Sequence, residues 1–141
     1  MKNALMSLCG AALKIMLLAT ILISAACQSA PKPEAKAPLV GWRPLGSWSG
    51  RGDAQSDSFL SDSGQLRLKW ETKHERAPGS GRFRLTVHSA ISGRPLALAV
   101  EHRGEGHDVA YVNEDPRLFH LVIESVDIDW SVSVEEAVSG D

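Results

Sequence analysis

The feature that most constrains the fold is an alternation of apolar and polar side chains in several short runs. In residues 65–71 every second residue is apolar, and residues 82–88 repeat the pattern. Because successive side chains of a β-strand point to opposite faces, this period of two predicts half-buried strands. The side chains that would face the core are Leu66, Leu68, Trp70, Phe83, Leu85 and Val87.

Segments rich in Gly, Pro, Asn, Asp and Ser separate these runs, which is typical of turns. We therefore expect consecutive strands to pair as hairpins. The registers that bring apolar side chains together place Trp70 opposite Phe83, Val100 opposite Val109 and Leu121 opposite Trp130. Seven or eight short antiparallel strands predict an all-β domain, a two-sheet β-sandwich, with a small β-barrel as the alternative.

The C-terminal part of the chain supports the same fold by resemblance. Residues 116–125 and 127–136 are similar to the closing hairpin of small secreted or lipid-anchored bacterial β-sandwich domains, most of them uncharacterised. The shared motif is the spacing of core residues. The resemblance implies a fold and transfers no function.

A basic, apolar leader precedes the domain. It carries Lys2 and Lys14, has an apolar run over residues 15–23 that is too short to span a bilayer, and ends in small residues before Cys27. These features predict a signal peptide over residues 1–26. The cleavage region resembles a lipobox, which implies acylation of Cys27 and attachment to a membrane. Secretion without acylation is the alternative.

Residues 27–47 are rich in proline and show no apolar periodicity, so we expect a tether between the lipid anchor and the domain. The β-sandwich would then cover residues 48–138, followed by a tail at residues 139–141. Gln28, directly after the cysteine, favours the outer membrane by resemblance to Gram-negative lipoproteins, with the domain facing the periplasm or the cell surface. A soluble periplasmic or secreted form is the alternative.

Charge and cysteine content exclude some functions. The chain has 15 basic and 17 acidic residues, and removal of Lys2 and Lys14 with the leader leaves 13 against 17, a net charge of −4. A nucleic-acid partner is therefore not expected. The mature chain would keep only Cys27 of the two cysteines, so the domain folds without a disulfide. No motif places a nucleophile beside a base, and we expect no enzyme.

The densest group of potential ligands lies at residues 101–108. In the predicted hairpin, His102 and His107 are cross-strand neighbours and Glu105 lies in the turn between them. Imidazoles and carboxylates bind divalent metals, so these three residues are a candidate metal site. A solvated hairpin tip is the alternative, and no other cofactor is expected.

A second candidate site is basic. The predicted first hairpin has Arg67, Lys69, Arg82 and Arg84 on its outer face, with Lys69 against Arg84. Like charges at such positions repel. Acidic residues of the last strand, an envelope glycolipid or an acidic partner protein could relieve the repulsion. A solvated, charged sheet face is the alternative.

Aromatic residues give a third candidate. We expect Trp70 and Trp130 in the core, which leaves Trp42, Trp48 and Tyr111 as possible platforms for a sugar ring. Taken together, the sequence predicts an exported, lipid-anchored envelope lipoprotein whose sandwich is a non-enzymatic interaction module. A module that binds a carbohydrate or a divalent metal is the alternative.

Overall fold

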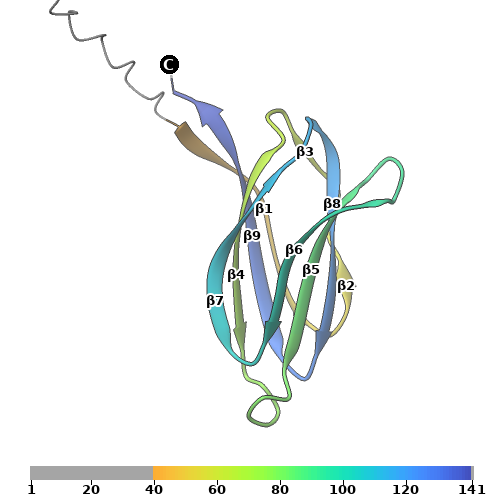
Figure 1. The fold of residues 1–141 in the computed structure, drawn as a ribbon, viewed down its shortest axis with the longest axis vertical. Coiled ribbons are helices and arrows are strands. Elements are labelled where there is room, and N and C mark those ends of the chain that lie inside the picture. Colours follow the sequence, from red (N-terminus) through yellow and green to blue (C-terminus); the bar gives the residue numbers. More distant parts are fainter. Residues whose placement is uncertain (1–39, 141) are drawn as a thin grey trace, which may run out of the picture. The chain divides into compact units, whose positions relative to one another are not determined.

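The computed structural model describes residues 40–140, which form nine β-strands in two antiparallel sheets (Figure 1). Sheet A has the order β1-β9-β4-β7 and contains β1 (Val40–Arg51), β9 (Asp129–Ser139), β4 (Gln65–Lys73) and β7 (Gly106–Asn113). Sheet B has the order β2-β8-β5-β6, with β3 also paired to β8, and contains β2 (Ala54–Gln55), β3 (Phe59–Ser61), β5 (Arg82–Ser89), β6 (Pro95–Arg103) and β8 (Arg117–Val126).

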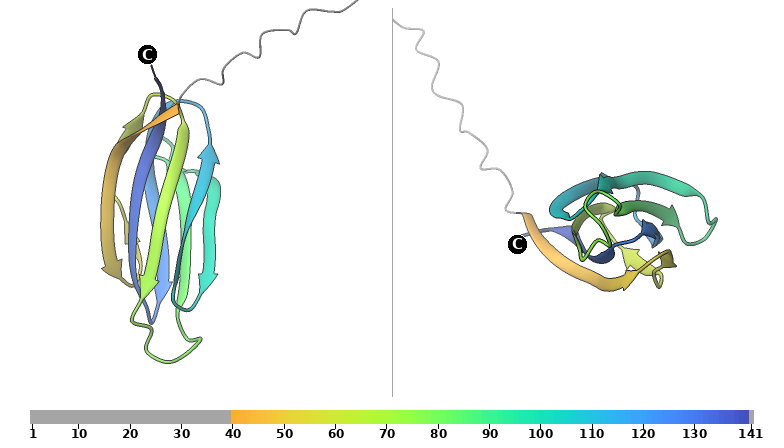
Figure 2. Two further views of the ribbon diagram at one scale, coloured as in Figure 1. Left: turned by 90° about the vertical axis from the view of Figure 1, so that its left-hand side faces the viewer. Right: turned by 90° about the horizontal axis from the view of Figure 1, so that it is seen from below.

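The two sheets lie face to face, as the view from below shows (Figure 2). The predicted all-β, two-sheet sandwich is confirmed, and the sheets do not close into a barrel. Within residues 40–140 no helix is long and apolar enough to cross a membrane. The predicted signal peptide, Cys27 and residues 28–39 lie outside the described residues.

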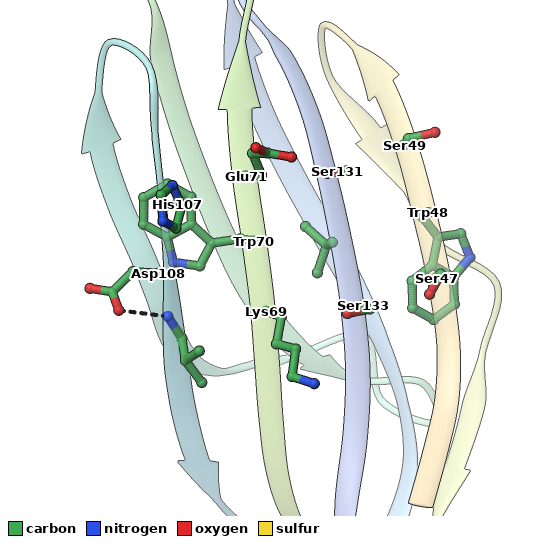
Figure 3. A pocket seen from close by; sticks show the side chains of 12 residues that line it. Ser47, Trp48, Ser49, Lys69, Trp70, Glu71, His107, Asp108, Ser131 and Ser133 are labelled. Atoms are coloured by element: carbon green, nitrogen blue, oxygen red, sulfur yellow. Dashed lines mark hydrogen bonds between the residues drawn. The ribbon is translucent and has the colours of Figure 1, made fainter.

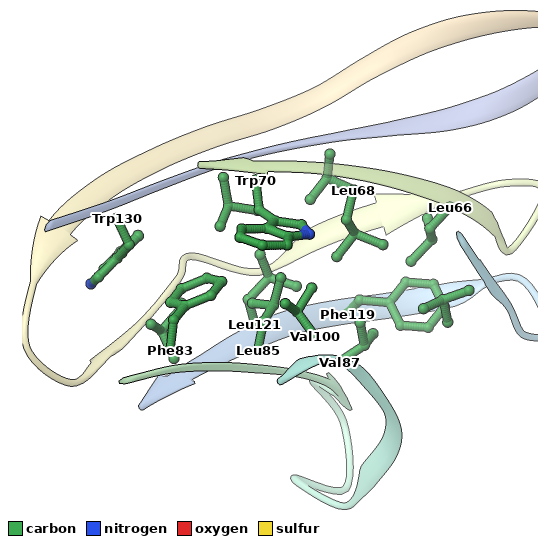
Figure 4. Close-up of a cluster of buried hydrophobic side chains, with 14 of the residues drawn as sticks. Leu66, Leu68, Trp70, Phe83, Leu85, Val87, Val100, Phe119, Leu121 and Trp130 are labelled. Carbon is green, nitrogen blue, oxygen red and sulfur yellow. The ribbon is translucent and has the colours of Figure 1, made fainter. Parts of the chain in front are cut away.

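The core fills the space between the sheets (Figure 4). The predicted inward faces of β4 and β5 are confirmed, because Leu68 and Leu85 are fully buried and Trp70 contacts Phe83 with ring centroids 5.7 Å apart. The other large side chains of the core include Leu66, Val87, Phe119, Leu121, Ile123, Trp130, Val132 and Val134. Burial of these apolar surfaces is the main force that holds the sheets together.

All three predicted hairpins are wrong. β4 pairs with β7 and β9, β5 pairs with β6 and β8, and β8 and β9 belong to different sheets. Trp70 and Phe83 therefore meet across the space between the sheets and are not neighbours in one ladder. Two inward-facing apolar side chains can touch across the sandwich or as cross-strand neighbours in one sheet. The spacing of apolar residues along the chain does not distinguish these two arrangements.

The predicted boundary between tether and domain is also wrong. β1 begins at Val40, eight residues before the expected start, and pairs with β9 as far as Ser139. The register shifts between Pro44 and Gly46, which is a β-bulge or irregularity. Such a shift interrupts the alternation of side chains, so the first half of the strand lacks the expected pattern. Residues 40–47 are part of sheet A.

Candidate functional site

An open groove of about 850 Å³ lies on sheet A (Figure 3). Its floor contains four serines in two adjacent strands, where Ser47 pairs with Ser133 and Ser49 pairs with Ser131. The rest of the lining comes from Trp48, Val132, Lys69, Trp70, Glu71, His107, Asp108 and Val109. Serine side chains are short, so the surface is lower over β1 and β9 than over longer side chains of β4.

Charged side chains border the groove. Lys69 donates to Glu135 at 3.0 Å, and Arg67 forms an ion pair with the same carboxylate. Burial alone would raise the pKa of Glu135, but the hydrogen bonds from Lys69 and Arg67 outweigh it and hold the pKa below its usual value. Glu71 pairs with Lys73 at 2.8 Å. The groove therefore presents hydroxyls together with charges that already have partners.

An aromatic cluster extends the same face. Trp42 and Tyr111 have ring centroids 6.0 Å apart, and the guanidinium of Arg67 lies 4.2 Å from the centroid of the Trp42 ring. Tyr111 is 63% exposed, and Val109, two residues before it on β7, lines the groove. Because residues two apart in a strand share a face, the aromatic cluster and the groove form one continuous surface.

The predicted division of the tryptophans into core and surface residues is confirmed for the two that were expected in the core. Trp70 and Trp130 are buried, which confirms their place in the core. Trp48 packs against Phe59, with ring centroids 5.6 Å apart, is half-buried and also lines the groove. Trp42 is half-buried.

The four basic residues predicted to share one face are divided between two. Arg67 and Lys69 belong to β4 of sheet A, whereas Arg82 and Arg84 belong to β5 of sheet B. The expected repulsion between Lys69 and Arg84 does not arise, because these residues are not neighbours. Glu135 forms ion pairs with both Arg67 and Lys69, and Glu124 lies 3.7 Å from Arg84. A single basic patch made of all four side chains is therefore absent.

The three predicted metal ligands also diverge. His102 is on β6 of sheet B and His107 is on β7 of sheet A, so the expected cross-strand pair is not formed. His102 packs on the ring of Trp70 at 4.8 Å, while Glu105 accepts a hydrogen bond from the Glu75 amide at 3.2 Å. In the part of the chain that the structure describes, no three His, Cys, Asp or Glu side chains gather as a metal-binding group.

The most densely bonded polar group is one that the sequence analysis missed. The carboxylate of Glu136 on β9 is fully buried and reaches the loop after β3. It accepts hydrogen bonds from Ser61 Oγ at 2.7 Å, from the Asp62 and Ser63 amides at 2.9 and 3.1 Å, from Ser63 Oγ at 3.3 Å and from Arg43 Nε at 2.8 Å. We call this set the Glu136 cluster.

These hydrogen bonds determine the pKa of the Glu136 carboxyl group. Burial alone would raise the pKa of Glu136, but the bonds from Ser61, Arg43 and the two backbone amides lower it to about 2. The carboxylate therefore stays ionised and links β1, β9 and the loop after β3. One signal in the sequence pointed to it: Trp130, Val132 and Val134 alternate inward along β9, and the next inward position is an acid.

No protein-family model matches the chain, and no curated protein matches it in sequence. The continuous surface of sheet A combines hydroxyls, paired charges and aromatic rings, and these groups suit binding by hydrogen bonds and stacking.

Proposed function

We propose that this protein is an exported, lipid-anchored envelope protein whose β-sandwich is a non-enzymatic interaction module. Acylated Cys27 would hold it at the outer membrane, and the outer face of sheet A would bind the partner. The observation that carries the proposal is the uncovered surface formed by the groove and by the cluster of Trp42, Tyr111 and Arg67.

The composition of this surface supports recognition of another protein. Tyr, Trp and Arg contribute most of the binding energy at many protein interfaces. Tyr111 and Val109 are exposed apolar side chains on the edge strand β7. The short serines on β9 and β1, across β4 from them, let a partner approach the sheet closely. Arg67 is already oriented by Glu135 and by Trp42, so it loses little conformational freedom on binding.

Site-specific photo-crosslinking in intact cells tests this proposal. A photoreactive residue replaces Val109, which is 39% exposed on sheet A, or Val126, which is 44% exposed on sheet B and serves as the matched control. We expect a discrete adduct from position 109 that disappears when Tyr111 is changed to Ala. Equal adducts from both positions would contradict the proposed face.

The membrane part of the proposal needs its own measurement. Mass spectrometry of the mature protein should find an N-terminal Cys27 that carries acyl chains. An unmodified Cys27 would mean that the protein is secreted without a lipid anchor. The proposal for the binding face would not change.

A carbohydrate is the second candidate ligand for the same surface. Aromatic faces stack on sugar rings, and the serine hydroxyls and the carboxylate of Glu71 could bond to sugar hydroxyls. Titration with oligomers of N-acetylglucosamine, followed by tryptophan fluorescence, tests this candidate. A saturable change that Trp42→Ala abolishes would favour it, and no change at millimolar sugar would remove it.

A further inference from the structure

Two histidines form a pair on the outer face of sheet B, far in sequence from the predicted metal site. His88 on β5 and His120 on β8 are direct partners in the antiparallel register. Their ring centroids are 5.3 Å apart and the ring planes are inclined by 36°. Cross-strand partners are held at a fixed separation by the ladder, so this pair is preorganised.

The separation suits joint coordination of one ion. A zinc–nitrogen bond of about 2.0–2.1 Å places the centre of each imidazole about 3.2 Å from the metal. Two such rings at a tetrahedral angle have centres about 5.2 Å apart. The observed distance of 5.3 Å agrees with this value, so the two rings already have the separation that a shared metal requires.

The hydrogen bond made by His88 sets its tautomer. Nδ1 lies 3.0 Å from the carbonyl oxygen of Gly93. Because a carbonyl oxygen only accepts, Nδ1 carries the proton and Nε2 keeps a free lone pair. Histidine ligands in metal sites very often donate their second N–H to a carbonyl in this way.

His120 supplies the second lone pair. Its side chain is only 8% exposed, and the hydrogen bonds described within residues 40–140 include none to its ring. Burial and, to a smaller extent, the neighbouring His88 lower the pKa of His120. Neutral imidazole is the form that binds a metal.

The surroundings select the kind of ion. On β5, β6 and β8 the neighbouring positions of the ladder hold Leu118, Val122, Thr86 and Pro95, none of which is charged. Asp57 lies in the segment between β2 and β3, which pair with the other edge of β8. Mg²⁺ and Ca²⁺ require several oxygen ligands, whereas imidazole suits Zn²⁺ and Cu²⁺.

We propose that His88 and His120 form a two-histidine site for a late first-row transition-metal ion, Cu²⁺ or Zn²⁺, with water in the remaining coordination positions. The Irving–Williams order makes Cu²⁺ the tighter of the two. This site is separate from the surface of sheet A and does not depend on the proposed function.

The test uses the purified full-length protein in detergent, with CuCl₂, ZnCl₂ and MgCl₂ as probes. We expect an electron paramagnetic resonance spectrum of bound Cu²⁺ with two nitrogen ligands, and a rise in melting temperature with Zn²⁺ but not with Mg²⁺. His88→Gln changes a half-exposed residue and should abolish both effects. His107→Gln, at the tip between β6 and β7, is the matched control and should keep them.

Several results would overturn the proposal. They are the lack of a bound Cu²⁺ spectrum from the wild-type protein, unchanged binding in His88→Gln, or loss of binding in His107→Gln. Circular dichroism of His88→Gln and His107→Gln confirms that both variants are folded.

Discussion

The Glu136 cluster and the tip between β6 and β7 contain similar chemical groups in opposite environments. At the tip, His102, Glu105 and His107 are close in sequence, but they belong to two sheets and a turn and make separate contacts. In the Glu136 cluster, residues more than 70 positions apart converge on one fully buried carboxylate. Consecutive strands of this sandwich often belong to different sheets. Residues that are close in the sequence therefore need not lie together in one site.

The largest effect should come from removing the buried charge. Glu136→Ala leaves Ser61, Arg43 and two amides without their acceptor, and we expect the free energy of unfolding to fall by about 3–5 kcal/mol. Urea denaturation measures it. Glu135→Ala, next along β9 but on the outer face, is the matched control and should cost about 1 kcal/mol or less. Equal losses would mean that burial does not distinguish the two acids.

Acid should weaken the same cluster in wild-type protein. The pKa of Glu136 is about 2 in the folded state and 4.5 in the unfolded reference, so its contribution is complete above pH 4.5 and is lost as the pH falls towards 2. The difference amounts to roughly 3 kcal/mol. The contribution of the Glu136 carboxylate is the difference between the free energies of unfolding of the wild type and Glu136→Gln, measured at pH 2–7. Parallel curves over that range would contradict the assigned pKa.

A smaller loss is expected at Ser61. Its hydroxyl donates to Glu136 at 2.7 Å and accepts from the Gly64 amide at 2.9 Å, so Ser61→Ala breaks two buried bonds. We expect a loss of about 1–3 kcal/mol in the free energy of unfolding. Ser63→Ala removes two longer bonds of 3.3 Å, one donated to Glu136 and one accepted from the Gln65 amide, and should cost less. The reverse order would show that the loop after β3 does not depend on Ser61.

The smallest effect should be at the tip. Glu105 is exposed, so Glu105→Gln should change the free energy of unfolding by no more than about 0.5 kcal/mol. Chemical denaturation with and without ZnCl₂ checks this value. A loss of several kcal/mol, or a loss of zinc-induced stabilisation, would make the tip a functional site after all.

The elements of the fold could be read from the sequence because their signal is local. Inward residues of β4 and β5 alternate with outward ones, and the predicted faces are correct. β1 was partly missed because the register shift between Pro44 and Gly46 breaks the period. The candidate sites were predicted less accurately than the strands, because the four basic residues are divided between the two sheets. Only the inward position of Glu136 on β9 indicated the buried cluster.

By itself, the sequence determined that the domain is all β and which side chains of β4 and β5 face the core, and it predicted an exported protein. Only the tertiary structure decided which strands are neighbours, and hence that Ser61 meets Glu136 and His88 meets His120. The physical reason is that side-chain alternation depends on the backbone geometry of one strand. Pairing depends on how strands distant in sequence bury their faces together, and several pairings satisfy the same local pattern.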